Sequence, residues 1–494
     1  MKKIISASLV TMMAITGANA ISNSELAAKL NDLESELAKI KKKLKKQNKK
    51  INKVKAHDSG DNIKWGVDLR TGLDNINYSM ADGSKQGKND LLSMRLWLNM
   101  AYAPDSNNVF KGQLSMNKAF GANFATPGVF NYFDWTTNEA LNDNALRVRQ
   151  AYWLYLGESA FGLDMPWTFS LGRRPSTGGF LSNLREDDTA QSPLGHVINV
   201  EFDGLSSKLD LSNITGVPGM SIKVCMGQGS TNAYPLIGSS SGTPNANNVN
   251  GVKDIRLAGF IFEPYNDGQY IVKASWYRGF DVPDADINAT GSVLTPLKTV
   301  GDMDGAALSV LVDGLTDEGY FADAKIFGSF AWTKSHPNGT TVSVPDGAGG
   351  IINVPGMLGS SNSETGTSYW FGAQLPVTED GVFGIEYNHG SQYWRPFTYA
   401  EDTMAGSKLA VRGDAFEVYF TYQLTDALSA QARYTVMNYD YTGSNGFFGG
   451  STGGSQKISD LKAAAVAGNA QAKAALPFIV EKAQDARFYI RYRF

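Results

Sequence analysis

The chain of 494 residues contains one cysteine, Cys225, and no apolar run as long as a membrane-spanning helix. A single cysteine cannot form an internal disulfide, which excludes a disulfide-stapled scaffold. A spanning helix needs about 20 consecutive apolar residues, so a helical membrane protein is excluded as well. Charged residues are only 19% of the chain, whereas soluble proteins average about 25%. Aromatic residues are plentiful at 11%, which argues against a disordered chain.

Histidine is also scarce, and none of the four histidines lies at metal-ligand spacing. We therefore expect no transition-metal site and no cofactor. No histidine stands in a clear pattern beside a nucleophile, so we expect no enzyme. Two histidines are predicted to lie on strands of a sheet, namely His196 and His389.

The first twenty residues have the pattern of a secretory signal peptide. Lys2 and Lys3 precede a short apolar stretch, and Ala18-Asn19-Ala20 is a small-residue cleavage pattern. We expect cleavage after Ala20. An exported chain with no cysteine pair fits a Gram-negative envelope better than a disulfide-rich extracellular setting.

Residues 21–58 contain no Pro, Gly, Phe, Tyr or Trp, and their apolar residues recur at alternating steps of four and three. This heptad pattern predicts a periplasmic coiled coil, and its mixture of Leu and Ile favours a homotrimer. A lone amphipathic helix is the alternative. The basic run 41–55 indicates contact with anionic envelope material such as peptidoglycan, or a solvated surface. Export excludes nucleic acid as its partner. The seam residues are Leu26, Leu30, Leu33, Leu37, Ile40, Leu44, Ile51 and Val54.

From residue 59 to residue 494 the sequence consists of short segments in which apolar and polar residues alternate. Examples are residues 63–70, 93–102 and 416–424. A period of two with one apolar face predicts strands, and the apolar face turns toward lipid in a membrane barrel. Short and long connections alternate, which is typical of an outer-membrane barrel. We predict an all-β, transmembrane antiparallel barrel of sixteen strands, with both chain ends on the periplasmic side.

Two details of this topology are open to test. We assign a strand to 195–204 and a turn excursion to 205–218; a strand pair there raises the count to eighteen. Aromatic residues near strand ends predict girdles at the membrane interfaces. These residues are Tyr152, Trp167, Trp276, Trp332, Trp370 and Trp394.

The chain ends in an alternating strand that places Phe488, Ile490, Tyr492 and Phe494 on one face. Here the sequence resembles the bacterial outer-membrane porins, and that resemblance implies that the terminal Phe is read by the barrel-insertion machinery. Four further stretches resemble an uncharacterised proteobacterial porin-like family. They are Arg147-Val-Arg149-Gln-Ala-Tyr152, Leu171-Gly-Arg173-Arg174-Pro175, Phe202-Asp203-Gly204 and Arg491-Tyr-Arg-Phe494.

Charge is distributed unevenly between the wall and the loops. On the faces assigned to the lumen, basic residues outnumber acidic ones, so we expect a preference for anions. Residues 174–195 form the third outer connection, which folds inward in general porins. Its acidic residues are predicted to face Arg147, Arg149 and Arg173 of the wall across a constriction; a surface loop with local pairs is the alternative. The predicted pore-lining residues are Arg95, Arg147, Arg149, Arg173, Arg174, Arg185, Glu186, Asp187 and Asp188.

Together these patterns predict an outer-membrane porin through which small hydrophilic solutes diffuse. The alternative is a closed barrel that tethers the outer membrane to the cell wall through its basic stalk. An outer loop rich in acidic residues keeps a calcium site open as a hypothesis, although its spacing departs from that of an EF-hand. The oxygen donors in that loop are Asp281, Asp284, Asp286, Asn288, Asp302 and Asp304.

Overall fold

The computed structural model describes residues 63–121, 144–174, 176–230, 233–234, 247–248, 253–290, 292, 294, 297–316, 318–345, 349–398, 404–444 and 455–494. The predicted signal peptide (1–20) and coiled coil (21–58) lie outside these residues. Among the residues described, no helix is long and apolar enough to cross a membrane.

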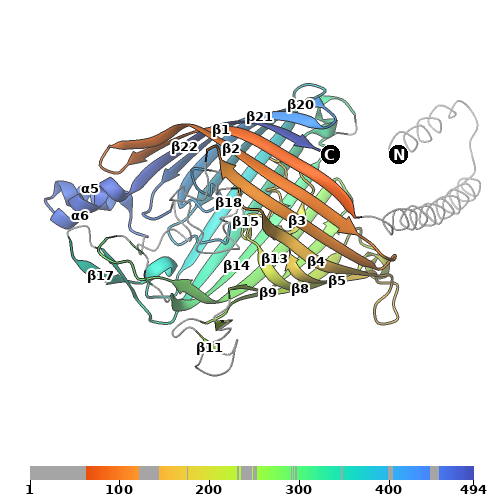
Figure 1. Ribbon diagram of the computed structural model, residues 1–494, viewed down its shortest axis with the longest axis horizontal. Helices are drawn as coiled ribbons and strands as arrows, with labels where there is room; N and C mark the ends of the chain where they lie inside the picture. Colours follow the sequence, from red (N-terminus) through yellow and green to blue (C-terminus); the bar gives the residue numbers. More distant parts are fainter. Residues whose placement is uncertain are drawn as a thin grey trace, which may run out of the picture. The chain divides into compact units, whose positions relative to one another are not determined.

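Sixteen antiparallel strands form one closed barrel, as predicted. Each strand pairs with the next one around the wall, and the first and last strands close the barrel between Asp68↔Arg493 and Met80↔Val480. The C-terminus lies at one end of the barrel, and helices α5 and α6 lie at the opposite end (Figure 1). The strands are β1 (Lys64–Met80), β2 (Lys85–Tyr102), β3 (Asn108–Ala119), β4 (Arg147–Gly157), β5 (Trp167–Arg174), β8 (Phe202–Asp210), β9 (Ser221–Ser230), β12 (Ile255–Asn266), β13 (Tyr270–Asp284), β14 (Lys298–Asp313), β15 (Lys325–Pro337), β18 (Thr365–Pro376), β19 (Gly381–Gly390), β20 (Gly413–Thr425), β21 (Leu428–Tyr439) and β22 (Val480–Arg493).

Shorter elements belong to the connections. Three two-stranded sheets, β6–β7, β10–β11 and β16–β17, stand outside the barrel order. Helices α5 and α6 lie in the connection before the last strand. The bounds are β6 (Gly179–Phe180), β7 (Gln191–Leu194), α4 (Ser212–Thr215), β10 (Ala233–Tyr234), β11 (Asn247–Asn248), η1 (Tyr320–Asp323), β16 (Val342–Pro345), β17 (Ile351–Val354), η2 (Gly356–Leu358), α5 (Ile458–Val466), α6 (Ala470–Ala475) and η4 (Leu476–Phe478).

One strand boundary differs from the prediction. Strand β8 begins at Phe202, so 195–201 belongs to the preceding connection, and residues 205–210 continue the strand instead of forming an excursion. Helix α4 and a turn then lead to β9. The apolar residues of 195–201 resemble those of a strand, but they pack inside the barrel and not in its wall. The count therefore stays at sixteen.

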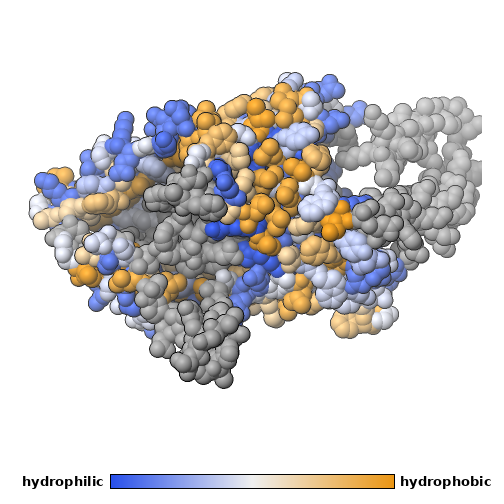
Figure 2. Space-filling model, in the orientation of Figure 1, coloured by the Kyte–Doolittle hydropathy of each residue, from blue (hydrophilic) through white to orange (hydrophobic). Residues whose placement is uncertain are grey.

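The alternation of the sequence is realised as two faces of the wall. In β20 the side chains of Phe416 and Phe420 are outward and exposed, whereas Glu417 and Tyr419 are inward and buried. The outer face gathers apolar residues midway along the strands, with hydrophilic residues toward the ends (Figure 2). An apolar exterior around a polar interior is the pattern of a barrel that sits in lipid.

The predicted aromatic girdles are wrong for three residues. Tyr152, Trp370 and Trp394 are buried within the barrel. Trp276 does lie on the outer face, where its ring centroid is 6.0 Å from that of Phe260. Position near a strand end did not distinguish the faces, because inward connections also need large rings to fill the space they enclose.

Two connections fold into the barrel and meet there. Residues 176–201, which we call the inward segment, and the connection between β19 and β20, described at 391–398 and 404–412, are joined by a parallel bridge between Ile198 and Phe397. The Phe397 backbone N–H donates to the Val197 carbonyl at 3.0 Å. Around this bridge lies an apolar cluster that includes Leu194 and Trp394. The interior is thus partly filled by the protein's own chain.

Candidate functional site: the lumen and the inward segment

The inward segment is anchored by apolar side chains at its start. Phe180, Leu181 and Leu184 are buried against wall residues that include Trp370 and Phe327. The Leu184 carbonyl accepts a hydrogen bond from the Gln374 side chain at 2.8 Å. Burial of these three side chains stabilises an inward path for the chain, as expected for the predicted constriction.

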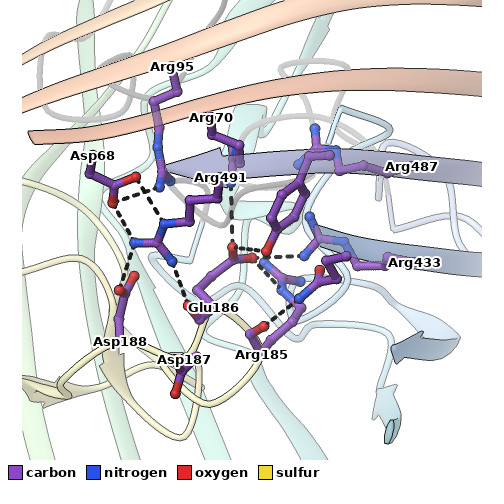
Figure 3. Close-up of polar contacts among 12 residues, drawn as sticks. Asp68, Arg70, Arg95, Arg185, Glu186, Asp187, Asp188, Arg433, Arg487 and Arg491 are labelled. Atoms are coloured by element: carbon purple, nitrogen blue, oxygen red, sulfur yellow. Dashed lines mark hydrogen bonds and ion pairs between the residues drawn. The ribbon is translucent and has the colours of Figure 1, made fainter. Parts of the chain in front are cut away.

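Glu186 is held by several groups at the tip of the segment (Figure 3). Its carboxylate accepts hydrogen bonds from Arg433 at 2.9 Å and from the Tyr489 hydroxyl at 3.1 Å. Arg70 lies 3.4 Å away, and the neighbouring Arg185 is at 3.0 Å. Hydrogen bonds between ionised partners are shorter and stronger than those between neutral groups. This carboxylate therefore ties the segment to the inner faces of β1, β21 and β22.

The next two acidic residues extend the contact along β22. Arg491 donates to Asp188 at 2.8 Å and to the Glu186 carbonyl at 2.6 Å, while its Nε donates to Asp68 of β1 at 2.9 Å. Arg493 binds Asp187 and, at 3.1 Å, Asp188. We call Glu186–Asp188 the acidic tip. It is fastened where the first and last strands close the barrel.

The partners of the acidic tip correct our expectation, because they are not Arg147, Arg149 and Arg173. Arg149 is inward at a β-bulge, where it donates to Gln113 at 2.8 Å and to Thr177. Its guanidinium lies 3.4 Å from Glu201.

Of the other two arginines, Arg147 lies opposite Ser115 in the register of β3 and β4. Ser115 is buried on the inner face of β3, so Arg147 is on the inner face as well. Arg173 is on the outer face with Leu171 and pairs with Asp203 at 3.1 Å. Both Arg173 and Arg174 were predicted to line the pore, but neighbouring residues of a strand point to opposite faces. Only Arg174 is therefore on the inner face.

Arg95 lies within the same buried region. Its guanidinium is 3.4 Å from the centroid of the Trp97 ring, and Arg149 lies 4.3 Å from that ring. Arg95 also reaches Asp68 at 3.5 Å. The aromatic ring between two cations keeps these arginines in place by cation–π attraction. Arg95 thus lies on the inner face of β2, buried among these groups.

Sequence reasoning missed a second ion cluster. Lys408, from the connection 391–412, donates to Glu386 at 2.6 Å and to Glu417. Arg185, which precedes the acidic tip in the inward segment, reaches Glu417 at 3.2 Å. The two inward connections therefore share one buried carboxylate. Alternation had placed both glutamates on the inner face, but no local signal in the sequence could place Lys408 beside them.

His196 lies on the inward segment and not on a strand, which corrects the prediction. Its ring nitrogens are 2.8 Å from the Ser329 hydroxyl and 2.9 Å from the Ser368 hydroxyl. The ring packs between Trp370 and Trp394. Complete burial lowers the pKa of His196 to about 3, so the ring is neutral at ordinary pH.

A cavity of about 780 Å³ opens at the C-terminal end of the barrel between the inward segment and β1–β4. Asp68, Gln113, Arg149 and Arg491 are among its polar lining residues. Apolar and aromatic residues, Trp97 among them, line the same space, so charged, amide and apolar groups all face the cavity.

The acidic loop does not assemble a cation site. Asp286 binds Lys298 at 2.8 Å, Asp302 binds Arg278 at 2.9 Å, and Asp284 accepts the Met357 N–H at 2.7 Å. No group of three or more potential metal-ligating residues occurs in the described part of the chain. Asp284, Asp286 and Asp302 thus have protein cations or backbone amides as partners.

The last strand carries its apolar residues outward. The exposed fractions of Phe488, Ile490, Tyr492 and Phe494 are 48%, 44%, 44% and 70%. The intervening Arg487 and Arg491 are buried inside. The predicted face of the terminal strand is therefore correct.

Solved structures with the same type of barrel align with most of the chain. OmpF of Salmonella typhi, in complex with daunomycin, is 11% identical with a TM-score of 0.45, and the match covers 88% of this chain and 99% of that one. OmpT of Vibrio cholerae in its trimer form is 12% identical with a TM-score of 0.43, covering 88% and 99%. No curated protein matches. A family model described as "Protein of unknown function (DUF3373)" matches residues 85–494, and the chain therefore belongs to this family.

Proposed function

We propose that the protein is an outer-membrane pore through which small hydrophilic solutes diffuse, with the inward segment as its constriction. The observation that carries the proposal is the contrast between the two faces of a closed wall. Apolar residues such as Phe416 and Phe488 are outward, while Asp68, Arg149 and Glu417 are inward. A barrel with this polarity fits lipid outside and water inside.

We further propose a modest preference for anions. The acidic tip neutralises basic residues near β1 and β22, so those arginines contribute little to selectivity. Four basic residues lie on the inner faces of β5, β8, β9 and β13, and the ion pair that the described residues form there joins Lys273 to Glu263. Fixed charges of one sign close to a narrow passage favour the opposite ion. These basic residues are Arg174, Lys208, Lys223 and Lys273.

The test is conductance in a planar lipid bilayer. The purified protein should give open steps of stable size, and its zero-current potential in a salt gradient should indicate anion preference. A protein that inserts without conducting contradicts the pore.

A pair of cysteine variants locates the conduction path. In a Cys225→Ser background, Lys111→Cys places a thiol on the inner face of β3 beside the large cavity. A charged methanethiosulfonate should then lower the conductance. Its neighbour Phe110 is on the outer face, 38% exposed, so Phe110→Cys is the matched control and should show no change. Equal responses of the two variants contradict conduction through the lumen.

Outer-membrane insertion is proposed to depend on the terminal aromatic residue, which the barrel-insertion machinery would recognise. Phe494→Ser should reduce the amount of barrel in the outer membrane while export continues. Normal membrane levels of the variant contradict this role. The residue is 70% exposed, so its loss should not disturb the interior.

The tether remains the second candidate, because the two inward connections fill part of the interior. It takes its function from residues 21–58, for which we propose a periplasmic homotrimeric coiled coil that contacts peptidoglycan. Deletion of 21–58 should weaken the oligomer without unfolding the barrel. A silent barrel that retains cell-wall material through this stalk favours the tether over the pore.

A further inference from the structure

A second, smaller cavity lies between the inward segment and the opposite wall. Its volume is about 60 Å³, and it is lined by residues of β5, β8, β9, β12 and β13 together with 192–194 of the inward segment. Strands β5, β8 and β9 run side by side at this part of the barrel (Figure 1). We call this space the basic pocket, because two basic residues line it.

The lining includes Arg174 and Lys223 and no acidic residue. The Lys223 ammonium donates to the Ser192 hydroxyl at 2.6 Å, which is a neutral partner. The Nε of Arg174 is buried with no hydrogen-bond partner among the described residues. Buried charge is costly unless an opposite charge accompanies it. The lining thus has two cations and no carboxylate to balance them; the thiol of Cys225 is the lining group that interacts with both cations.

The surroundings add to this excess. The positive charges of Lys208 and Lys273 both act on Lys223, as does that of Arg174. Glu263 approaches Lys273 at 3.5 Å and balances one of these charges. The cluster therefore keeps a net positive charge beside the pocket, which favours an anionic occupant.

Hydroxyl groups supply further donors. Ser176, Ser192 and Ser275 all line the pocket. Ser275 is only 7% exposed, and its Oγ has no hydrogen-bond partner in the described part of the chain. A buried hydroxyl without a partner is uncommon in folded proteins and indicates a group that pairs with something else. A bound oxyanion provides such an acceptor.

The remaining wall is apolar and the space is small. Leu194, Phe202, Leu257 and Ile261 line the pocket beside the charged groups. One water molecule needs roughly 10–15 Å³ of such space, so the cavity has room for about four to six non-hydrogen atoms. A planar carboxylate suits the guanidinium fork of Arg174, and a short alkyl group suits the apolar side.

We propose that the basic pocket binds a carboxylate of two or three carbons between Arg174 and Lys223, with its alkyl part against the apolar wall. The proposal rests on the pore function, because it names a class of solute that enters the lumen. The pocket is separate from the acidic tip and from the large cavity beside β1–β4.

Cys225 offers a direct probe because it lines this pocket and is the sole cysteine of the chain. Iodoacetate is a two-carbon carboxylate, whereas iodoacetamide is its neutral analogue. In both reactions the thiolate sulfur displaces iodide from the methylene carbon. In the full-length protein, the ratio of the iodoacetate rate to the iodoacetamide rate should exceed that of a free thiol by about tenfold, because local cations concentrate the anion. Acetate or propionate should slow both reactions by occupying the pocket.

Variants separate charge from structure. Arg174→Gln and Lys223→Gln should each lower the rate ratio toward that of a free thiol, whereas Lys223→Arg, which keeps the charge, should retain it. Lys111→Gln is the matched control, since Lys111 is a basic residue of the inner wall outside this pocket. A free-thiol ratio in the unmodified chain, or protection by chloride as strong as by acetate, overturns the proposal.

The two proposals fail in different ways. A protein that is silent in the bilayer but shows carboxylate protection at Cys225 contradicts the pore and keeps the binding site. A conducting protein whose Cys225 reacts without any effect of acetate keeps the pore and overturns the binding site.

Discussion

Two parts of the inner wall, which we call the seam arc and the basic arc, differ in how their basic residues are paired. On the seam arc, formed by β1, β2 and β20–β22, Arg433, Arg491 and Arg493 pair with the acidic tip and hold the inward segment, while Arg487 and Asp74 pair within the wall. On the basic arc, formed by β5, β8, β9, β12 and β13, basic residues meet hydroxyls, apolar side chains and a single glutamate. The comparison teaches that paired charge fixes structure, whereas charge left unbalanced is available to a solute.

The largest effect should come from breaking the seam arc at its centre. Glu186→Gln leaves Arg70 and Arg433 without their carboxylate in a buried setting. Removal of one partner from such a pair should lower the free energy of unfolding by about 3 kcal/mol. Unfolding in detergent measures this change. The released segment should also give larger conductance steps. An unchanged stability and conductance would show that the acidic tip does not hold the segment.

The next effect is a dependence of stability on pH through His196, which is buried where the two inward connections meet. His196 has a pKa of about 3 in the folded protein, below its unfolded value near 6.5. The unfolded chain therefore binds more protons between pH 6.5 and pH 3, and stability falls as the pH decreases through that window. One proton corresponds to about 1.4 kcal/mol per pH unit.

The control for this pH dependence is His196→Gln, which has no ring to protonate. Denaturation midpoints of both proteins at pH 7, 6, 5 and 4 isolate the histidine contribution, since other groups titrate alike in each. The unmodified chain should lose stability faster below pH 6. Parallel profiles refute the assigned burial.

A smaller effect should appear on the basic arc. Neutralising Arg174 and Lys223 together should shift the zero-current potential toward cations, changing the permeability ratio about twofold, since both cations are unbalanced. Neutralising Arg147, Arg149 and Arg173 should change it less, because Arg149 is paired with Glu201 and Arg173 is outward with Asp203. A larger shift of the zero-current potential in the triple variant would show that Arg147, Arg149 and Arg173 determine the selectivity.

The smallest effect should come from Asp187→Asn. The side chain of Asp187 is 74% exposed and pairs with Arg493 at the edge of the acidic tip. Exposed ion pairs contribute about 0–1 kcal/mol, so stability should change by less than about 0.5 kcal/mol. Unfolding measured beside Glu186→Gln makes this variant its matched control. Equal losses in the two proteins would contradict the distinction between buried and exposed pairs.

The faces of the wall were predictable, but the partners of its charges were not. Period two placed Glu417 and Arg491 inside and Phe416 and Phe488 outside. It fails only where the assignment starts from the wrong residue, as for Arg173. The partners of Glu186 come from strands at the far end of the chain, so no local pattern identifies them. Lys408 was missed for the same reason.

The sequence by itself determined that this chain forms a sixteen-stranded barrel with an apolar exterior, because alternation and turns are local and repeat along the wall. Only the tertiary structure decided which charges are paired. Closing the barrel brings β1 beside β22 and lets 176–201 cross the interior, so Glu186 meets Arg433 while Arg174 and Lys223 face hydroxyls. Electrostatic pairing depends on distance in space, which the order of residues does not contain until the wall is closed.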